Sequence, residues 1–257
     1  MSFPRFYCPT GSSSALLTGA RIDLPENAAR HAARVLRLRV GDGLVLFDGS
    51  GGEYSAGIVA VERDRVSVEV QQWHDSECEA PIRLTLVQAL QSGEKMDMTV
   101  QKAVELGVVR IVPVASRRSV VKLEGERALK RLDHWRGVAA SACEQCGRNR
   151  VPDVNALEGL DRWLDRPVVG DVLRLMLVPG SQRTLGQLAP PPPGGQVELL
   201  IGAEGGLAPD EIDRAERAGY MGVRLGPRIL RTETAGLAAL AAIQCLWGDF
   251  GGAVDHV

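Results

Sequence analysis

Two arginines and a glutamate near the C-terminus are the residues whose types and spacing most strongly suggest chemistry. Arg228, Arg231 and Glu233 lie within the stretch LGPRILRTETA at residues 225–235. A guanidinium group can stabilise a developing anion, and a carboxylate can accept a proton. Turns between rigid elements often present such groups. A well-capped surface turn accounts for the same residues equally well.

The elements that must position these side chains are a strand and a helix. The apolar run at residues 223–225 predicts a strand, and the Gly-Pro pair after it cannot continue a sheet ladder. Thr232 is the predicted N-cap of an apolar helix that runs on through residues 235–247, and Glu233 lies where the positive end of the helix dipole favours a carboxylate.

A second loop of the same kind lies upstream. Residues 197–201 (VELLI) predict a buried strand, and GAEGG follows at residues 202–206. Glycines let a backbone approach a ligand closely or adopt positive φ. The loop matches neither the dinucleotide-binding nor the P-loop pattern, so neither nucleotide site is indicated.

Together, IGAEGG at residues 201–206 and LGPRILRTETA at residues 225–235 resemble the paired signature of SPOUT-class RNA methyltransferases. The resemblance is greatest to the RsmE family, which methylates N3 of a uridine in 16S ribosomal RNA with S-adenosylmethionine. It recurs along nearly the whole chain. It implies an α/β protein with an N-terminal PUA-like β-barrel and a C-terminal SPOUT domain that contains a deep trefoil knot.

The composition fits a globular protein with no membrane span. The 257 residues are 45% hydrophobic and 24% charged, with a formal net charge of −2. RNA binding must then come from local basic patches rather than the global field. Five cysteines, an odd number, indicate a reducing compartment, and no secretory signal is evident. We therefore expect a cytoplasmic protein.

The N-terminal region, residues 1–75, predicts a small β-barrel with one helix. Strands are expected at residues 44–47, 54–61 and 66–70. A helix over residues 27–38 would align Arg30, Arg34 and Arg37 on one face as a footprint for phosphates, although a solvated helix face remains the alternative.

The second region, residues 76–257, alternates strand and helix, which predicts a parallel sheet. We expect strands at residues 82–88, 109–114 and 172–178, and helices at residues 95–106 and 126–146. Cys143 and Cys146 form a single CxxC pair, which is a poor metal site, so small buried side chains are the better interpretation.

The resemblance assigns roles to particular residues. The loops after Leu177, Ile201 and Leu225 would form the knot and hold the cofactor. Arg231 would stabilise the developing uracil anion, and Glu233 or Glu144 would assist proton removal. The expected cofactor contacts are Leu177, Val178, Pro179, Gly202, Ala203, Glu204, Gly205, Gly206, Leu225, Gly226, Ile229, Leu230, Arg231, Thr232, Thr234 and Ala235. The expected RNA contacts are Arg5, Arg30, Arg34, Arg37, Lys95, Arg117, Arg118, Gln145, Arg148, Asn149 and Arg150. For Arg117 and Arg118, which follow a predicted strand end, a solvated charged loop is an equal alternative.

Two positions depart from the family pattern. Ser92 stands where the family usually has lysine, which leaves Lys95 as the nearby cation. Ala208 replaces a capping serine, so we expect weaker capping, partly offset by Asp210 and Glu211. The implied partners are 16S ribosomal RNA in the small subunit and a second copy of the chain, with no metal.

Three alternatives remain. A SPOUT enzyme acting on a different RNA would keep both loops, but the N-terminal stretches at residues 3–7 and 27–39 argue against it. A non-catalytic RNA-binding protein would tolerate a degraded cofactor loop, whereas both loops look intact. A Rossmann-type methyltransferase would carry its glycine-rich loop after the first strand of the sheet, and here the loop comes late.

Overall fold

A computed structural model describes residues 3–9, 16–63 and 65–251 of the chain. The chain divides into two compact units, one made of residues 1–79 and 140–151, the other of residues 80–139 and 152–257. A segment from the middle of the sequence therefore belongs to the N-terminal unit. The prediction of two domains divided near residue 76 does not include residues 140–151 in the N-terminal unit.

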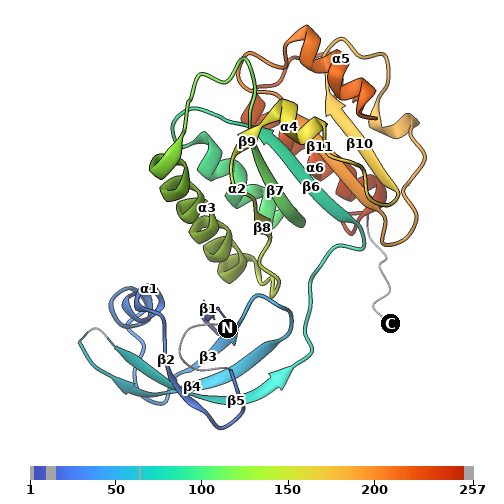
Figure 1. The fold of residues 1–257 in the computed structure, drawn as a ribbon. Helices are drawn as coiled ribbons and strands as arrows, with labels where there is room; N and C mark the ends of the chain where they lie inside the picture. The colour runs from blue at the N-terminus through green and yellow to red at the C-terminus, as the bar shows by residue number, and fades with distance from the viewer. Residues whose placement is uncertain (1–2, 10–15, 64, 252–257) are drawn as a thin grey trace. The chain divides into compact units, whose positions relative to one another are not determined.

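The first unit is built on a sheet whose described strands follow the order β1-β3-β4-β5-β2. β1 pairs with β3 in parallel, and the other pairs are antiparallel. Figure 1 shows these strands with the short helix α1 beside them. Its elements are β1 (Arg5–Tyr7), β2 (Arg21–Asp23), α1 (Glu26–Arg30), a π-helical turn (His31–Val35), β3 (Gly43–Phe47), β4 (Glu53–Val61) and β5 (Val66–His74).

The predicted strands of this unit are confirmed, but the predicted helix is too long. Residues 66–70 of β5 alternate buried and half-buried side chains, as their period of two indicates. The helical segment ends near Val35, and Arg37 has a φ of 55° in the left-handed region. Arg37 therefore does not continue the helical stripe of Arg30 and Arg34. The π-helical turn shifts the phase of side chains, which the 3.6-residue period could not foresee.

The second unit is a parallel sheet covered by helices on both faces. Its described strands follow the order β12-β10-β11-β6-β7-β8, and β9 also pairs with β7. Figure 1 shows β10, β11, β6 and β7 side by side. Its elements are β6 (Arg83–Ala89), α2 (Lys95–Glu105), β7 (Val108–Ala115), α3 (Gly125–Cys146, which ends in the first unit), β8 (Asp153–Val154), β9 (Glu158–Gly159), α4 (Leu160–Leu164), β10 (Val172–Leu177), a 3-10 turn (Leu185–Gln187), β11 (Gln196–Ile201), α5 (Pro209–Arg217), β12 (Met221–Val223) and α6 (Thr232–Trp247).

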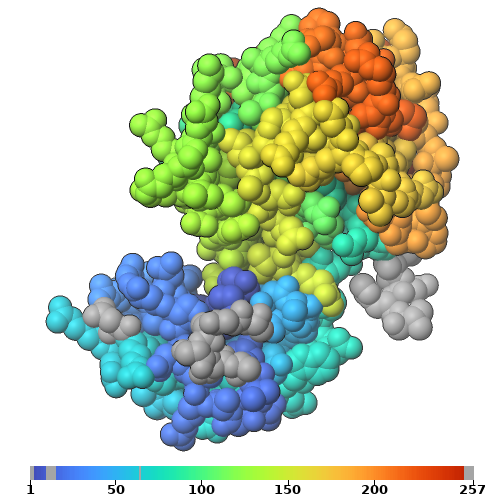
Figure 2. Space-filling model, viewed as in Figure 1, coloured from blue at the N-terminus to red at the C-terminus, as the bar shows by residue number. Residues whose placement is uncertain are grey.

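The core explains why these strands read as apolar runs rather than alternating ones. Val87 of β6, Val112 of β7 and Met176 of β10 pack with side chains of α4 and α5 in one buried cluster. On the opposite face α2 and α6 pack against each other and against the strands. A sheet buried on both faces needs apolar side chains at nearly every position. Figure 2 shows α5 and α4 as neighbours on the surface.

Candidate functional site

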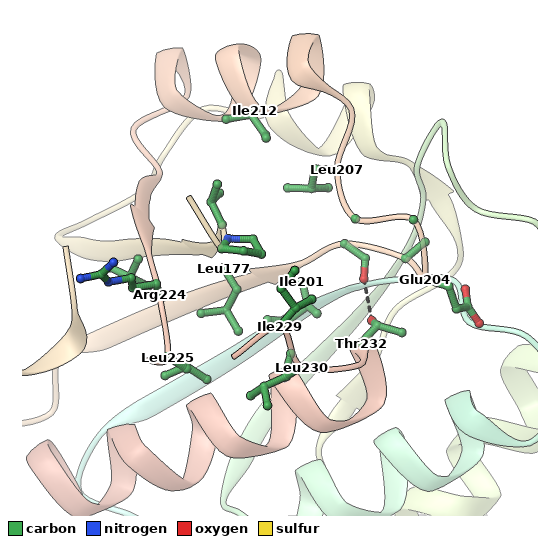
Figure 3. Close-up of a pocket in the computed structure, with 18 of the residues that line it drawn as sticks. Leu177, Ile201, Glu204, Leu207, Ile212, Arg224, Leu225, Ile229, Leu230 and Thr232 are labelled. Carbon is green, nitrogen blue, oxygen red and sulfur yellow. Dashed lines mark hydrogen bonds between the residues drawn. The ribbon is translucent and has the colours of Figure 1, made fainter. Parts of the chain in front are cut away.

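A pocket of about 330 Å³ lies where three neighbouring parallel strands end. β11, β10 and β12 are adjacent, and the loops that follow them supply most of the walls. Ligands of open α/β sheets bind at this edge. Figure 3 shows Leu207 and Ile212 on one side of the pocket and Leu225 and Leu230 on the other. The pocket's lining is Arg118, Leu177, Val178, Pro179, Ile201, Gly202, Ala203, Glu204, Gly205, Gly206, Leu207, Ile212, Val223, Arg224, Leu225, Gly226, Arg228, Ile229, Leu230, Thr232 and Ala235.

The lining contains every residue predicted to contact the cofactor except Arg231 and Thr234. Sequence reasoning missed several others as contacts. Arg224 and Arg228 directly adjoin predicted residues and Val223 lies two positions before Leu225, so a wider window would have included them. Ile212 reaches the pocket from α5, and no local sequence signal points to it.

One hydrogen bond joins the two glycine-containing loops. The Thr232 hydroxyl is buried and donates to the Gly202 carbonyl oxygen at 2.6 Å, as Figure 3 shows. The buried amide of Gln88 donates from Nε2 to Thr232 Oγ1 at 3.2 Å. The predicted N-cap role of Thr232 is wrong, because Arg231 occupies the N-cap position and makes no side-chain cap hydrogen bond. The hydroxyl instead fixes the start of α6 to the loop after β11.

The loop at residues 202–206 has glycines because larger residues would not fit. A Cβ on Gly202 would lie 2.6 Å from the Gly206 carbonyl carbon. Gly206 has a φ of +73°, which L side chains rarely adopt. Its N–H donates to the Ala203 carbonyl at 2.8 Å, so the loop forms a tight turn. This geometry brings the backbone of the turn to the surface of the pocket.

The loop at residues 116–119 packs onto the same turn. Arg118 donates from Nη1 to the Gly205 carbonyl at 2.7 Å. Arg117 pairs with Asp210 at 2.6 Å, while its own N–H donates to the Glu211 carboxylate at 2.8 Å. Both arginines were predicted to contact RNA, and each has an intramolecular partner that stabilises the pocket wall. No local sequence pattern indicates these partners, because they lie about ninety residues away along the chain.

Glu211 compensates for the missing capping serine. Its carboxylate is buried and accepts the N–H of Ala208, the N-cap residue of α5, at 2.8 Å. The expected offset by an acidic residue is confirmed for Glu211.

Glu204 is the acidic residue of the pocket lining. Ser92 donates to its Oε1 from both N–H, at 2.9 Å, and Oγ, at 2.7 Å. Burial raises the pKa of Glu204, but the hydrogen bonds from Ser92 and the charge of Lys95 outweigh burial and lower the pKa below its ordinary value. The carboxylate is therefore ionised at neutral pH. Ser92, which departs from the family pattern, therefore holds the Glu204 carboxylate in place.

The three predicted catalytic residues occupy different surroundings. Arg231 is exposed and precedes α6, where its carbonyl oxygen accepts the N–H groups of Thr234 and Ala235. Glu233 is half-buried in the first turn of α6. Glu144 belongs to the first unit and accepts the Tyr7 N–H at 2.9 Å. Burial raises the pKa of Glu144, against the effect of that hydrogen bond.

Several predicted RNA contacts of the first unit make internal bonds. The buried Arg148 pairs with Glu79 at 2.5 Å, and the buried Asn149 accepts a hydrogen bond from Arg5 at 2.5 Å. Arg150 pairs with Glu77 at 3.0 Å. These bonds tie the returning segment at residues 140–151 to β1 and to the segment that follows β5. The exposed members of the predicted set in this unit are Arg30, Arg34, Arg37, Gln145 and Arg150.

Neither metal ligands nor a membrane span emerge from the described part of the chain. Over residues 3–9, 16–63 and 65–251, no three His, Cys, Asp or Glu side chains are grouped as a metal ion would require. Within those same ranges, no helix combines the length and the apolarity that crossing a bilayer takes.

Comparison with known proteins identifies the family to which the chain belongs. Residues 78–244 match the RNA methyltransferase domain, and residues 24–71 match the RNA methyltransferase PUA domain. Ribosomal RNA small subunit methyltransferase E of Bacillus subtilis is 33% identical over 221 residues, which is 83% of this chain and 86% of the relative. The corresponding Buchnera aphidicola (Schizaphis graminum) protein is 32% identical over 228 residues, 89% of this chain and 92% of the relative.

Two solved structures are similar over nearly their whole length. Ribosomal RNA small subunit methyltransferase E from Neisseria gonorrhoeae, bound to S-adenosyl methionine, has a TM-score of 0.87 and 42% identity and covers 96% of this chain and 99% of its own. A methyltransferase from Legionella pneumophila in complex with the same cofactor has a TM-score of 0.91 and 35% identity, with 97% and 100% covered. By its sequence and its fold, this chain belongs to the ribosomal RNA small subunit methyltransferase E family.

Proposed function

We propose that the chain transfers a methyl group from S-adenosylmethionine to N3 of a uridine in 16S ribosomal RNA of the small subunit. The observation that carries this proposal is the pocket at the ends of β10, β11 and β12, because the predicted cofactor residues converge on it. Relatives with 35% and 42% identity were solved with S-adenosyl methionine bound.

The lining fits this cofactor chemically. A volume of about 330 Å³ lies within the range of small-molecule sites. Leu177, Ile201 and Leu230 offer apolar surface for a flat heterocycle, and the glycines of the turn at residues 202–206 let the backbone approach it closely. Glu204 is ionised and suits a cationic ligand. When bound, the cofactor supplies an electrophilic methyl group on a sulfonium sulfur.

The chain's own residues would handle the charge that moves. N3 of uracil must lose its proton as the N–C bond forms, so an anion develops on the base. We assign stabilisation of that anion to Arg231, whose exposed side chain at the start of α6 can reach a bound nucleotide. Glu233 and Glu144 remain the candidates for proton acceptance.

We further propose the finer features that the family resemblance implies. The segments after β10, β11 and β12 are threaded as a trefoil knot, which is supported by the return of β12 to the side of β10. The first unit forms a PUA-like barrel that binds RNA through Arg30 and Arg34. Two copies form a cytoplasmic homodimer without a metal. The dimer is supported by two exposed apolar side chains, Leu246 near the end of α6 and Phe250 just after it. Light scattering on the purified protein tests the dimer.

The decisive experiment maps methylated uridines by mass spectrometry. Small ribosomal subunits from a strain that lacks the gene are incubated with S-adenosylmethionine and the purified protein or its Arg231→Ala variant. One new methyluridine in 16S RNA is expected with the unchanged protein and none with the variant, although both bind the cofactor. A new methyl group only on a nucleotide other than uridine, or none at all, would refute the assignment.

A further inference from the structure

Lys95 lies between two carboxylates, one from the pocket lining and one from the first turn of α6, which borders the pocket. Its Nζ is 3.4 Å from Oε1 of Glu233 and 3.7 Å from Oε1 of Glu204. Lys95 begins α2, Glu204 follows β11, and Glu233 is in the first turn of α6. One ammonium group therefore links three segments that are far apart in the sequence.

These three charged side chains are partly buried, which strengthens the electrostatic interactions between them. The side chains of Lys95, Glu204 and Glu233 are only 33%, 28% and 13% exposed. Oε2 of Glu233 is buried and, among the described residues, has no hydrogen-bond partner. Two carboxylates in such a partly desolvated place repel each other, and a cation between them offsets this repulsion. Without Lys95, the loop after β11 and the start of α6 would tend to separate.

We propose that Lys95 is a positioning residue for the methyl-donor pocket. Its ammonium group holds the Glu204 loop against the start of α6, and we call this arrangement the clamp. This inference rests on the proposed function, since it concerns the same pocket. It differs from the predicted role of Lys95 as an RNA contact. A phosphate contact would affect RNA affinity and its salt dependence, whereas a clamp affects affinity for the donor in the absence of RNA.

Position 92 offers a way to test the charge itself. Ser92 Oγ is 2.7 Å from the same Glu204 oxygen, on a side chain that is not fully buried. A lysine at position 92 could therefore place its ammonium near Glu204 when Lys95 is lost. Rescue by a cation from another position would not be expected if Lys95 acted only through its packing or by contacting RNA.

The experiment is calorimetric titration of the RNA-free full chain with S-adenosylmethionine. We expect Lys95→Met to raise Kd about five- to tenfold, in the range for coupled neighbours. Lys95→Arg, and the double variant Lys95→Met with Ser92→Lys, should restore most of the affinity. Lys102→Met is the matched control, because Lys102 is on the same helix and pairs with Glu105 at 2.8 Å outside the pocket lining.

The outcomes separate this proposal from the proposed function. If the unchanged chain shows no heat of binding, the cofactor assignment fails. If it binds and Lys95→Met binds equally well, the clamp is refuted, and a higher KM for RNA in that variant would support the phosphate contact. If Lys95→Met weakens binding but neither Lys95→Arg nor the double variant recovers it, the electrostatic clamp is refuted. Melting temperatures of all variants show whether the fold is kept.

Discussion

The Arg174 guanidinium lies 3.2 Å from the Glu198 carboxylate, and both side chains are buried between neighbouring strands. The two residues are register partners on β10 and β11. Tyr220 donates its hydroxyl to Glu198 and accepts from Trp163 Nε1 at 2.9 Å. Burial, reinforced by the Glu198 charge, raises the pKa of Tyr220. This network fixes the chain just before β12, which leads into the pocket.

We predict that Arg174→Met destabilises the protein severely. It leaves the Glu198 carboxylate buried without its cation, which costs about 3–5 kcal/mol of unfolding free energy. Adding Glu198→Gln should recover most of the loss, since an amide oxygen still accepts from Tyr220. Urea unfolding measures both. The control is Lys130→Met, because the Lys130–Glu126 pair is 74% and 81% exposed and should contribute under about 1 kcal/mol. Equal stability of the Arg174→Met protein and the unchanged one would contradict this prediction.

The Thr232 hydroxyl should be required for donor binding. Thr232→Val keeps the shape but removes the donor to Gly202, at a cost of about 1–3 kcal/mol. We expect weaker binding of S-adenosylmethionine by calorimetry, because the two loops are no longer joined. Thr232→Ser retains the hydroxyl and serves as the control. The prediction fails if the valine and serine variants bind alike.

Gly202 and Gly205 of the loop at residues 202–206 should respond unequally to alanine. At Gly202 the new Cβ would meet backbone atoms at 2.6 Å and 2.8 Å, which cannot yield without opening the turn. At Gly205 the nearest atom is Cβ of the Arg118 side chain, at 3.2 Å. We expect Gly202→Ala to abolish cofactor binding and Gly205→Ala to weaken it slightly. Titration of both proteins gives the comparison, and the reverse order would disprove the account.

Two buried thiols should be inert in the folded protein. Burial raises the pKa of Cys8 and of Cys143 to about 12, so about one thiol in ten thousand is ionised at pH 8. Labelling with iodoacetamide and peptide mass spectrometry should find both modified only after denaturation. The raised values also mean that stability is fully present below the unfolded pKa of about 9 and is lost as pH rises toward 12. Label on either thiol in native protein would contradict the prediction.

The sequence by itself determined the features that depend on neighbouring residues. Glycines at positions 202 and 206 mark a tight turn, because a Cβ at Gly202 would meet backbone atoms and Gly206 has a positive φ, and both requirements are local. The alternation of apolar strands with helices predicted the parallel sheet, because burial on both faces leaves a direct record in the residue types. The residues around the pocket were expected from the resemblance to a known family, and they lie together because strand ends of a parallel sheet meet at one edge.

Only the tertiary structure decided which side chains meet. Ser92 binds Glu204 across 112 positions, and Arg118 reaches Gly205 across 87. Thr232 has the residue type of an N-cap, yet its hydroxyl bonds to Gly202 because the loop after β11 is packed against the start of α6. A side chain's type limits what it can bond to, while its partner depends on the packing of distant segments, which no local pattern records.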